Sequence, residues 1–358
     1  MPSCIPIPLL SIAALLLVAC SPQPLRGGDP DGAVRLSLFA LGDTGVEPAA
    51  VGRALQTQMR VATVLAAEHA RRPADALVLL GDNFYPDGLR ERELAFRIRE
   101  NVVRPYCSFL ALDGPESARV ADACPAERRS AVPTPIYAVL GNHDTNLPES
   151  PPLQREAVPR FVPNWRMPPG AVEVVELLDD ALVPSVSLIL YDAAALADAG
   201  DVASLRQALA AARGPWRILA GHYPISDRHP GPWIRRALDE IEVPVHVHLA
   251  GHDHNLQIGT PSPGDPYLQA VAGSGGEARE VRHGIEGARF AAIEPGFARI
   301  DLVGEGETER LVVSLVAAPR WSAIDRAPRV VSRWSVDLRG TVREEPASEN
   351  PLEPPGNR

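Results

Sequence analysis

Five short apolar runs in this chain each end in a glycine that is followed directly by a polar residue able to bind a metal. The five segments are Gly42-Asp43-Thr44-Gly45, Gly81-Asp82-Asn83-Phe84-Tyr85, Gly141-Asn142-His143-Asp144, Gly221-His222-Tyr223-Pro224 and Gly251-His252-Asp253-His254-Asn255. Glycine allows the chain to reverse sharply and the backbone to approach a ligand closely. The apolar runs have the length of buried strands. The pattern therefore predicts strands that end together at one polar rim.

Strands and helices are expected to alternate along most of the chain. The predicted strands cover residues 34–41, 76–80, 136–140, 172–178, 186–190, 216–220 and 243–249, and the predicted helices cover residues 48–69, 90–103, 202–213 and 232–240. The proline-rich residues 148–169 are expected to form a loop near the rim, and residues 267–271, 297–302, 311–316 and 333–338 are expected to be strands. This alternation indicates an α/β fold with mixed sheets built from βαβ units. Ligands of such sheets bind at the carboxyl ends of the strands.

The formal net charge of the 358 residues is -10. That value argues against a nucleic-acid partner, for which clustered Lys and Arg would be expected. It does not exclude an anionic substrate, because a bound metal reverses the local sign of the charge.

The N-terminal residues resemble a bacterial export signal. Residues 9–19 are apolar and too short to span a membrane, as in the apolar part of a secretory signal. Leu17-Val18-Ala19-Cys20 resembles a lipobox, in which cleavage before the cysteine leaves it lipidated. Residues 1–8 contain no Lys or Arg, so an ordinary cleaved signal or a wrongly chosen start codon remain alternatives. We expect a lipoprotein anchored through Cys20 on the periplasmic side of a bacterial membrane, or else a soluble periplasmic or secreted protein.

Cys107 and Cys124 are the only cysteines outside the leader. An oxidising compartment would favour a disulfide between them, and two free buried thiols are the alternative. They lack the Cys-x-x-Cys spacing of a zinc site.

The polar rim offers a mixed set of oxygen and nitrogen donors: Asp43, Asp82, Tyr85, Asn142, His222, His252 and His254. Seven donors are too many for one tetrahedral zinc and suit two metals if one carboxylate bridges them. Two ions about 3.5–4 Å apart polarise a phosphoryl group and lower the pKa of bound water. The set predicts hydrolysis of a phosphate ester by a metal-bound hydroxide, with a histidine as proton donor to the leaving group.

The five motifs, in this order, resemble those of the purple acid phosphatases of the small, tartrate-resistant type, within the calcineurin-like metallophosphoesterase superfamily. The resemblance covers residues 36–303 and is carried by the sequences GDNFY at 81–85, GNHD at 141–144, GHYP at 221–224 and GHDHNLQ at 251–257. It implies a four-layer β-sandwich flanked by helices and an acid phosphatase that hydrolyses phosphomonoesters. Together with the composition of the two ends of the chain, the motifs predict a division into a signal peptide with lipobox (1–20), a flexible tether (21–33), a catalytic domain (34–320), additional C-terminal strands (321–342) and a disordered tail (343–358).

Residue by residue, the resemblance implies Fe(III) held by Asp43, Asp82, Tyr85 and His254. A divalent ion, Fe, Zn or Mn, would be held by Asp82, Asn142, His222 and His252, with Asp82 bridging. Tyr85 discriminates this subgroup, because a phenolate suits Fe(III) and its charge transfer to iron would colour the protein purple.

Two more histidines are implied to face the phosphate. His143 follows Asn142 and would contact the substrate, and His229 is the expected proton donor. Asp144 is expected to orient a histidine, as carboxylates do at metal sites. His246 and His248 alternate along a strand and are expected to be packed or hydrogen-bonded, and Asp253 is expected to point away from the metals.

The expected partner is a small phosphorylated substrate, and the chain is expected to be a monomer. Two other functions remain open on the sequence. A phosphodiesterase or nucleotide hydrolase would use the same metals, and a surface-anchored binding lipoprotein would carry a structural or vestigial metal site.

Overall fold

The computed structural model describes residues 33–47, 53–178, 182–241, 243–260, 268–282, 284–319 and 328–347. The expected signal segment with Cys20, the tether up to residue 32 and most of the expected tail (residues 348–358) lie outside these ranges. Residues 48–52 of the first expected helix also lie outside them. Within the described ranges, no helix combines the length and the apolar character needed to cross a membrane.

The described residues form two mixed sheets, which confirms the predicted α/β class. The first has eight strands in the order β15-β14-β13-β12-β1-β2-β3-β4, with bounds β1 Val34–Leu41, β2 Ala76–Leu79, β3 Ile136–Ala138, β4 Trp165–Arg166, β12 Gly296–Val303, β13 Arg310–Ala317, β14 Arg329–Asp337 and β15 Val342–Glu344. The second has seven in the order β11-β9-β10-β8-β7-β6-β5, with bounds β5 Val172–Leu178, β6 Pro184–Tyr191, β7 Trp216–Ala220, β8 Val247–Ala250, β9 Leu256–Gly259, β10 Leu268–Ala272 and β11 Ala288–Ala292.

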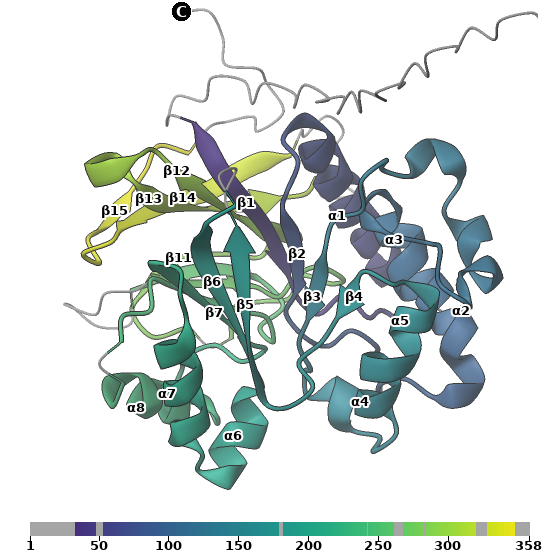
Figure 1. The fold of residues 1–358 in the computed structure, drawn as a ribbon, viewed down its shortest axis with the longest axis horizontal. Helices are drawn as coiled ribbons and strands as arrows, with labels where there is room; N and C mark the ends of the chain where they lie inside the picture. Colours follow the sequence, from purple (N-terminus) through teal and green to yellow (C-terminus); the bar gives the residue numbers. More distant parts are fainter. Residues whose placement is uncertain are drawn as a thin grey trace, which may run out of the picture.

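Two groups of helices lie on opposite sides of the paired sheets (Figure 1). The group beside the first sheet comprises α1 Arg53–Arg71, α2 Leu94–Ile98, α3 Arg104–Tyr106, α4 Ser150–Pro152 and α5 Val158–Phe161. The group beside the second sheet comprises α6 Ala193–Ala199, α7 Val202–Ala211 and α8 Gly231–Asp239. A π-helical turn at Arg99–Val103 joins α2 to α3, so the expected helix at 90–103 is present but extends to Tyr106.

Three apolar layers result from the alternation of side chains along the strands. In β1, Leu36 and Leu38 face the second sheet and pack in a core with Leu188 and Leu249. Phe39 and Leu41 face the other way, into the core beneath α1 to α5. A third core lies between the second sheet and α6 to α8, where Tyr191 packs with residues of all three helices. The order helix, sheet, sheet, helix is the expected four-layer sandwich.

Each strand that precedes one of the five polar motifs runs parallel to at least one neighbour. β1 pairs in parallel with β2, and β2 with β3. In the second sheet β7 pairs in parallel with β6 and β8, and the strands predicted at 172–178 and 186–190 are present as β5 and β6, which pair antiparallel. All five motifs therefore lie at the carboxyl ends of parallel strands, as predicted.

The structure differs from the expectations in three segments. Residues 148–169 are not one long loop, because α4, a π-helical turn at Leu153–Ala157 and α5 make residues 150–161 helical. The strands β9 and β11 were not anticipated. β15 (Val342–Glu344) pairs with β14 and continues the first sheet two residues into the expected disordered tail.

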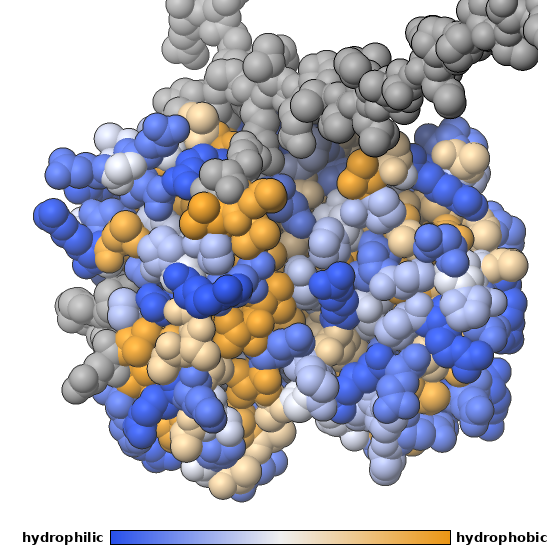
Figure 2. Space-filling view, in the orientation of Figure 1, coloured by the Kyte–Doolittle hydropathy of each residue, from blue (hydrophilic) through white to orange (hydrophobic). Residues whose placement is uncertain are grey.

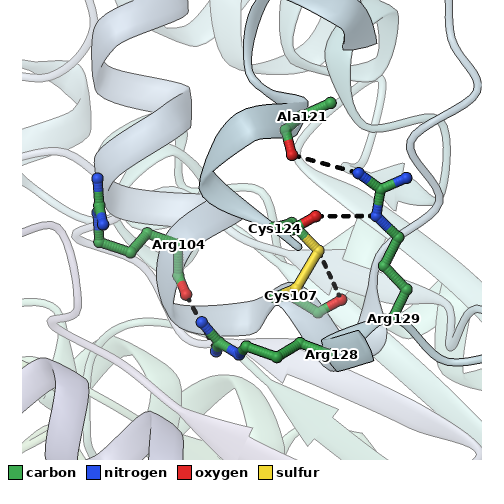
Figure 3. Close-up of a disulfide and its surroundings, with 6 residues drawn as sticks. All are labelled: Arg104, Cys107, Ala121, Cys124, Arg128 and Arg129. Carbon is green, nitrogen blue, oxygen red and sulfur yellow. Dashed lines mark hydrogen bonds between the residues drawn. A yellow bond between two sulfur atoms is a disulfide. The ribbon is translucent and has the colours of Figure 1, made fainter. Parts of the chain in front are cut away.

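Cys107 and Cys124 form a disulfide, with their Cα atoms 5.2 Å apart (Figure 3). Arg129 holds the second half of this loop, because its Nε donates to the carbonyl of Cys124 at 2.9 Å and its Nη2 to that of Ala121 at 3.2 Å. Arg128 Nη2 donates to the carbonyl of Arg104 at 3.3 Å. The free-thiol alternative is thereby excluded in this structure.

Hydrophobic side chains gather on one part of the surface in the view of Figure 2. They lie over β5 and β6, whereas the surface over α4 and α5 is mostly hydrophilic. β5 is the outer strand of the second sheet, and most of its side chains are only partly buried.

Candidate metal centre

The five polar motifs meet where the carboxyl ends of the two sheets adjoin. The amide of Gly42, after β1, donates to the carbonyl of Ala272 at the end of β10 at 2.8 Å. The amide of Asp43 donates to the carbonyl of Gly81 at 2.9 Å, and that of Gly251 to the carbonyl of His222 at 2.9 Å. Backbone hydrogen bonds thus connect the motifs within each sheet and across the two sheets.

Glycine is required at two of these positions because neighbouring donor residues leave no room for a side chain. A Cβ at Gly81 would lie 2.7 Å from His222 Nδ1, and the φ of Gly81 is +86°. A Cβ at Gly141 would lie 2.2 Å from Asp82 Oδ1. The close approach expected from the glycine pattern is therefore confirmed.

Three of the predicted ligands have left-handed backbone conformations. The φ angles are 59° for Asp43, 54° for Asp82 and 66° for His252. Residues with a Cβ adopt this region at a cost, and such residues cluster at functional sites where the surrounding structure holds them in place. Here the amide of His252 donates to Asp43 Oδ2 at 2.8 Å, so two of the three hold each other.

A first group of donors surrounds the hydroxyl of Tyr85. This oxygen lies 2.8 Å from Asp82 Oδ2, 2.9 Å from Asp43 Oδ1 and 3.0 Å from His254 Nε2. His254 Nε2 is also 3.2 Å from Asp43 Oδ1. A phenol has one proton, so it can donate to only one of these three neighbours. Four lone-pair-bearing atoms this close together are suited to a shared cation.

A second group consists of Asn142, His222 and His252. Asn142 Oδ1 lies 3.1 Å from His222 Nε2 and 3.1 Å from His252 Nδ1, and the two ring nitrogens are 3.2 Å apart. The rings cross nearly at right angles, at 82°. One amide oxygen and two imidazole nitrogens converge, which again suits a cation.

Asp82 lies between the two groups. Its Oδ2 faces Tyr85, as above, while its Oδ1 lies 3.6 Å from His222 Nε2 and accepts the amide hydrogen of His143 at 2.9 Å. Ligand atoms of Asp43, Asp82 and His222 lie within 4.8 Å of one another. All seven residues predicted as ligands are therefore gathered in one place, with Asp82 in the position of a bridge.

The ionisable side chains in this buried group shift one another's pKa values. Burial raises the pKa of Asp43, but the imidazoles of His254, His222 and His252 outweigh it and hold the pKa below its usual value. Burial lowers the pKa of His222, but the opposite effect of the Asp82 and Asp43 charges is larger, so the pKa lies above its usual value. Burial and the nearby His222 lower the pKa of His252 to about 4, which keeps its ring neutral and available as a donor.

Tyr85 keeps its proton unless a positive charge is supplied. Burial first, and then the charges of Asp43 and Asp82, raise the pKa of this phenol above its usual value. A phenolate there would need a cation next to it to offset the two carboxylates. The chemistry of this donor set therefore fits a metal ion beside Tyr85.

The histidines differ in how their second ring nitrogen is held. His222 Nδ1 lies 2.8 Å from the carbonyl of Leu80, which fixes the ring with Nε2 toward the other donors. His254 Nδ1 is buried and has no hydrogen-bond partner among the described residues. The nearest carboxylate oxygen, Glu277 Oε2, is 3.9 Å away and bonds to Arg279 instead.

His143 lies at the edge of the group. Its Nδ1 is 2.5 Å from the carbonyl of Pro86, so Nδ1 carries the hydrogen and Nε2 remains available. Its ring packs on Tyr85, with 4.5 Å between the centroids. His229 does not join the seven residues through any contact within the described part of the chain. Its side chain is 64% exposed, and its Nε2 lies 3.3 Å from Asp198 Oδ1.

Asp144 does not orient a histidine, contrary to the expectation. Its buried carboxylate accepts hydrogen bonds from the amides of Asn83, Phe84 and Gly141 and from the side chain of Gln154. Asp144 therefore holds the second and third motifs together. The prediction was wrong because the side chain of Asp144 points toward the backbone amides of residues 83 and 84 and not toward a histidine.

The structure confirms the expectations for three further side chains. His248 on β8 bonds to Tyr191 and Gln269, and His246, just before β8, accepts from the amide of Arg217, so both are buried and hydrogen-bonded. Asp253 turns toward Arg228, with 2.5 Å between Oδ1 and Nη2. Two supporting residues were missed: Asn83, which donates to the carbonyl of Val139, and Gln154. Asn83 lies inside a recognised motif, but nothing in the sequence marks Gln154.

Comparison with known proteins agrees with this geometry. The model of the family of calcineurin-like phosphoesterases matches residues 36–256. The human tartrate-resistant acid phosphatase type 5 is 26% identical over 290 residues, which cover 74% of this chain and 79% of that protein.

Two solved structures share the fold. GAP50, described as the anchor in the inner membrane complex of Plasmodium, superposes with a TM-score of 0.58 at 16% identity, covering 89% of this chain and 90% of that one. PhoD superposes with a TM-score of 0.53 at 10% identity, covering 90% of this chain and 73% of that one. At these identities the likeness concerns the fold alone.

Proposed function

Because the chain belongs to the calcineurin-like phosphoesterase family, and is thus a metal-dependent phosphoester hydrolase, we propose that it is an acid phosphatase of the purple type. Its substrates would be phosphomonoesters, and its centre would hold Fe(III) with a divalent Fe, Zn or Mn. The observation that carries the proposal is the hydroxyl of Tyr85, which lies within 3.0 Å of Asp43, Asp82 and His254. A phenolate is a hard donor suited to Fe(III).

The two groups of donors divide between the two ions. Asp43, Asp82, Tyr85 and His254 would hold the ferric ion, and Asp82, Asn142, His222 and His252 the divalent one. Support comes from Asp82, whose Oδ2 faces Tyr85 at 2.8 Å while its Oδ1 faces His222 at 3.6 Å. When bound, two such ions polarise the phosphoryl group and lower the pKa of water.

The chain's own residues would bind the substrate and move protons. His143 Nδ1 is fixed by the carbonyl of Pro86 at 2.5 Å, which leaves Nε2 to contact the phosphate or the leaving oxygen. His229 is the second proposed proton donor. Its Nε2 lies 3.3 Å from Asp198 Oδ1, so it must rotate away from this carboxylate to reach the substrate.

The visible spectrum of the purified protein tests the proposal. We expect a purple protein that loses its colour in Tyr85→Phe, with the iron content measured in parallel. The matched control is Tyr137→Phe, which removes the hydroxyl of a tyrosine 5% exposed on β3 and should leave the colour unchanged. A colourless wild-type protein that contains no iron would overturn the proposed Fe(III) centre but not the assignment to the phosphoesterase family.

Measurements of enzymatic activity test whether the substrates are phosphomonoesters or phosphodiesters. Asp82→Ala should reduce phosphatase turnover by more than about 100-fold, since loss of residues that only support metal ligands already costs 10–100-fold. A phosphomonoester should be hydrolysed faster than the corresponding diester. Faster turnover of the diester would identify the phosphodiesterase alternative instead.

We further propose that the protein is exported and anchored through Cys20. Support comes from the lipobox-like Leu17-Val18-Ala19-Cys20 and from the disulfide between Cys107 and Cys124, a bond typical of oxidising compartments. Labelling with a palmitate analogue in a bacterial host should mark the wild-type protein and not Cys20→Ser. An unlabelled wild-type protein in the soluble periplasmic fraction would support an ordinary cleaved signal.

A further inference from the structure

The glycine-rich segment that follows β10 lies against two of the loops that carry proposed ligands. The amide of Gly275 donates to the carbonyl of Gly42 at 3.2 Å, and the amide of Arg279 donates to the carbonyl of His254 at 2.6 Å. These two hydrogen bonds hold the backbone on both sides of Glu277. The carboxylate of Glu277 therefore starts from a backbone that is fixed beside the candidate metal centre, although this segment belongs to none of the five motifs.

His254 has one buried ring nitrogen that lacks a partner. Its Nε2 lies 3.0 Å from the hydroxyl of Tyr85 and 3.2 Å from Asp43 Oδ1, so Nε2 faces the other donors. Its Nδ1 is buried and has no hydrogen-bond partner among the described residues. The corresponding nitrogen of His222, in contrast, has the carbonyl of Leu80 at 2.8 Å.

Use of His254 Nε2 as a ligand decides where the ring proton must lie. A neutral imidazole has one N–H, so a ring that offers the lone pair of Nε2 to a cation carries its hydrogen on Nδ1. A buried N–H without an acceptor costs free energy. A metal-binding His254 therefore needs an acceptor next to Nδ1, as histidine ligands usually have.

The carboxylate of Glu277 is placed to become this acceptor. Its Oε2 lies 3.9 Å from His254 Nδ1, so a movement of about 1 Å would bring it to hydrogen-bond distance. The same oxygen accepts from Arg279 Nε at 2.9 Å and Nη2 at 2.6 Å. The side chains of Glu277 and Arg279 are 47% and 61% exposed, and an exposed ion pair of this kind holds its members only weakly. Glu277 is thus free to turn.

Two other carboxylates lie next to proposed ligands in the sequence, but both have other partners. Asp144 accepts from backbone amides of the second motif. Asp253 pairs with Arg228. Glu277 is the carboxylate left to take the role that the sequence had suggested for Asp144.

We propose that Glu277 is a positioning residue for the metal beside Tyr85. With a metal at His254 Nε2, the carboxylate turns away from Arg279 and accepts the Nδ1 hydrogen of His254. This contact fixes the orientation of the ring and makes its Nε2 a stronger donor. The inference rests on the proposed metal centre, but it depends neither on which metals are bound nor on which esters are hydrolysed.

Zinc binding by the full-length protein tests the proposal without reference to catalysis. Zn(II) is loaded at both proposed positions, and its affinity is measured by competition with a chromogenic chelator. Glu277→Ala should weaken the binding of one of the two ions by about 10–100-fold. The matched control is Glu280→Ala, which removes the same charge from an exposed residue three positions further along and should bind zinc as the wild type does.

Two further variants separate the hydrogen bond from other roles of this side chain. Glu277→Gln keeps an acceptor but no charge, so its zinc affinity should lie between those of the wild type and Glu277→Ala. Arg279→Gln removes the competing partner of Glu277 and should bind zinc at least as tightly as the wild type. Equal losses in Glu277→Gln and Glu277→Ala would reduce the role to charge alone. A loss in Arg279→Gln as large as in Glu277→Ala would make the ion pair the important contact. Either result would overturn the proposal.

NMR of the zinc-loaded protein with 15N-labelled histidine observes the contact itself. We expect a zinc-bound Nε2 on His254 and an Nδ1–H resonance that moves upfield in Glu277→Ala but not in Glu280→Ala. An unchanged resonance or an unchanged zinc affinity in Glu277→Ala would overturn this inference and leave the proposed metal centre standing. Absence of zinc from His254 Nε2 in the wild type would overturn both. The expected changes in a protein without phosphatase activity would support the inference and overturn the proposed function.

Discussion

Gly141 is the residue at which a single methyl group would disturb the candidate metal centre most directly. A Cβ there would lie 2.2 Å from Asp82 Oδ1 and 2.4 Å from the amide nitrogen of Asp82. Gly141 has no positive φ, so its backbone conformation suits alanine and only the contact with Asp82 changes. We expect Gly141→Ala to displace the proposed bridging carboxylate and to lower metal content and phosphatase turnover by about 10–100-fold.

Gly170→Ala is the control for this prediction, because a Cβ at Gly170 meets no atom within 4 Å. It should leave metal content and turnover unchanged. Both variants should unfold in one cooperative transition, which circular dichroism during heating checks. A Gly141→Ala protein with full metal content and full activity would show that Asp82 does not need its present position.

The sequence predicted which side chains gather at the site better than what each one does. The seven proposed ligands each follow a glycine and an apolar run closely, so local pattern and parallel strands together place them. The role of Asp144 could not be predicted, because its partners are the amides of residues 83 and 84 and a side chain from residue 154. The pairing of His229 with Asp198 likewise depends on where α6 ends, which no spacing within its own motif determines.

There are physical reasons why the sequence did not predict some helices and strands. Prolines led us to expect a loop at residues 148–169, but Pro151, Pro152 and Pro159 lie in the first turns of α4 and α5. A proline in the first turn of a helix removes no hydrogen bond. β9 (Leu256–Gly259) begins directly after the fifth motif, so no turn signal separates it from the site.

The disulfide carries a prediction at the scale of elements. Cys107 follows α3, Cys124 ends the short turn at residues 121–123, and the bond closes a loop with a sequence separation of 17. A loop of this length stabilises the folded state by about 3 kcal/mol in the chain-entropy model. Replacing both cysteines by alanine should lower the free energy of unfolding in urea by about that amount.

Reduction provides the control for this prediction. A reducing agent should lower the urea midpoint of the wild-type protein to nearly that of the double variant and should not change the variant itself. Activity of the folded variant should be retained, because both cysteines pack in the core beneath α1 to α5 and neither touches the proposed ligands. If a thiol reagent labels Cys107 and Cys124 themselves in the unreduced, unfolded protein, the bond is absent.

At the scale of the whole molecule, the division into two sheets was expected only through the resemblance. The alternation of strands and helices would equally suit one continuous parallel sheet. What separates the sheets is burial: inward residues such as Leu38 of β1 and Leu249 of β8 share one core, although they belong to different sheets. This pairing brings the ends of β1 and β10 within hydrogen-bonding distance, with 2.8 Å between Gly42 N and Ala272 O.

The same burial predicts that the molecule loses stability in acid. His248 on β8 is fully buried, and burial lowers its pKa from 6.5 to about 4. Its neighbours carry no charge, since Tyr191 lies 2.8 Å from Nε2 and the amide oxygen of Gln269 lies 3.3 Å from Nδ1. Gln269 Oε1 already accepts from the amide of Ile225 at 2.6 Å, so it accepts from His248 Nδ1 as well, and Nε2 accepts from Tyr191.

The sign of the effect follows from which state binds the proton. Between pH 6.5 and pH 4 the unfolded chain protonates His248 and the folded protein does not, so the free energy of unfolding falls as the pH falls. The contribution of neutral His248 to the free energy of unfolding is fully present above pH 6.5, and about 2 kcal/mol of it is lost by pH 5. His246, whose pKa burial also lowers to about 4, adds to the loss. An enzyme proposed to work in acid would therefore work below its most stable pH.

His248→Gln isolates this contribution, because glutamine can bond to Tyr191 and Gln269 but does not titrate. The measurement is the difference between the free energies of unfolding in urea at pH 7 and pH 5. This difference should shrink by about 2 kcal/mol in the variant, whatever the variant costs at pH 7. His229→Gln, at a histidine 64% exposed, should leave the difference unchanged. An unchanged difference in His248→Gln would mean that His248 titrates alike in both states and that the acid sensitivity lies elsewhere in the molecule.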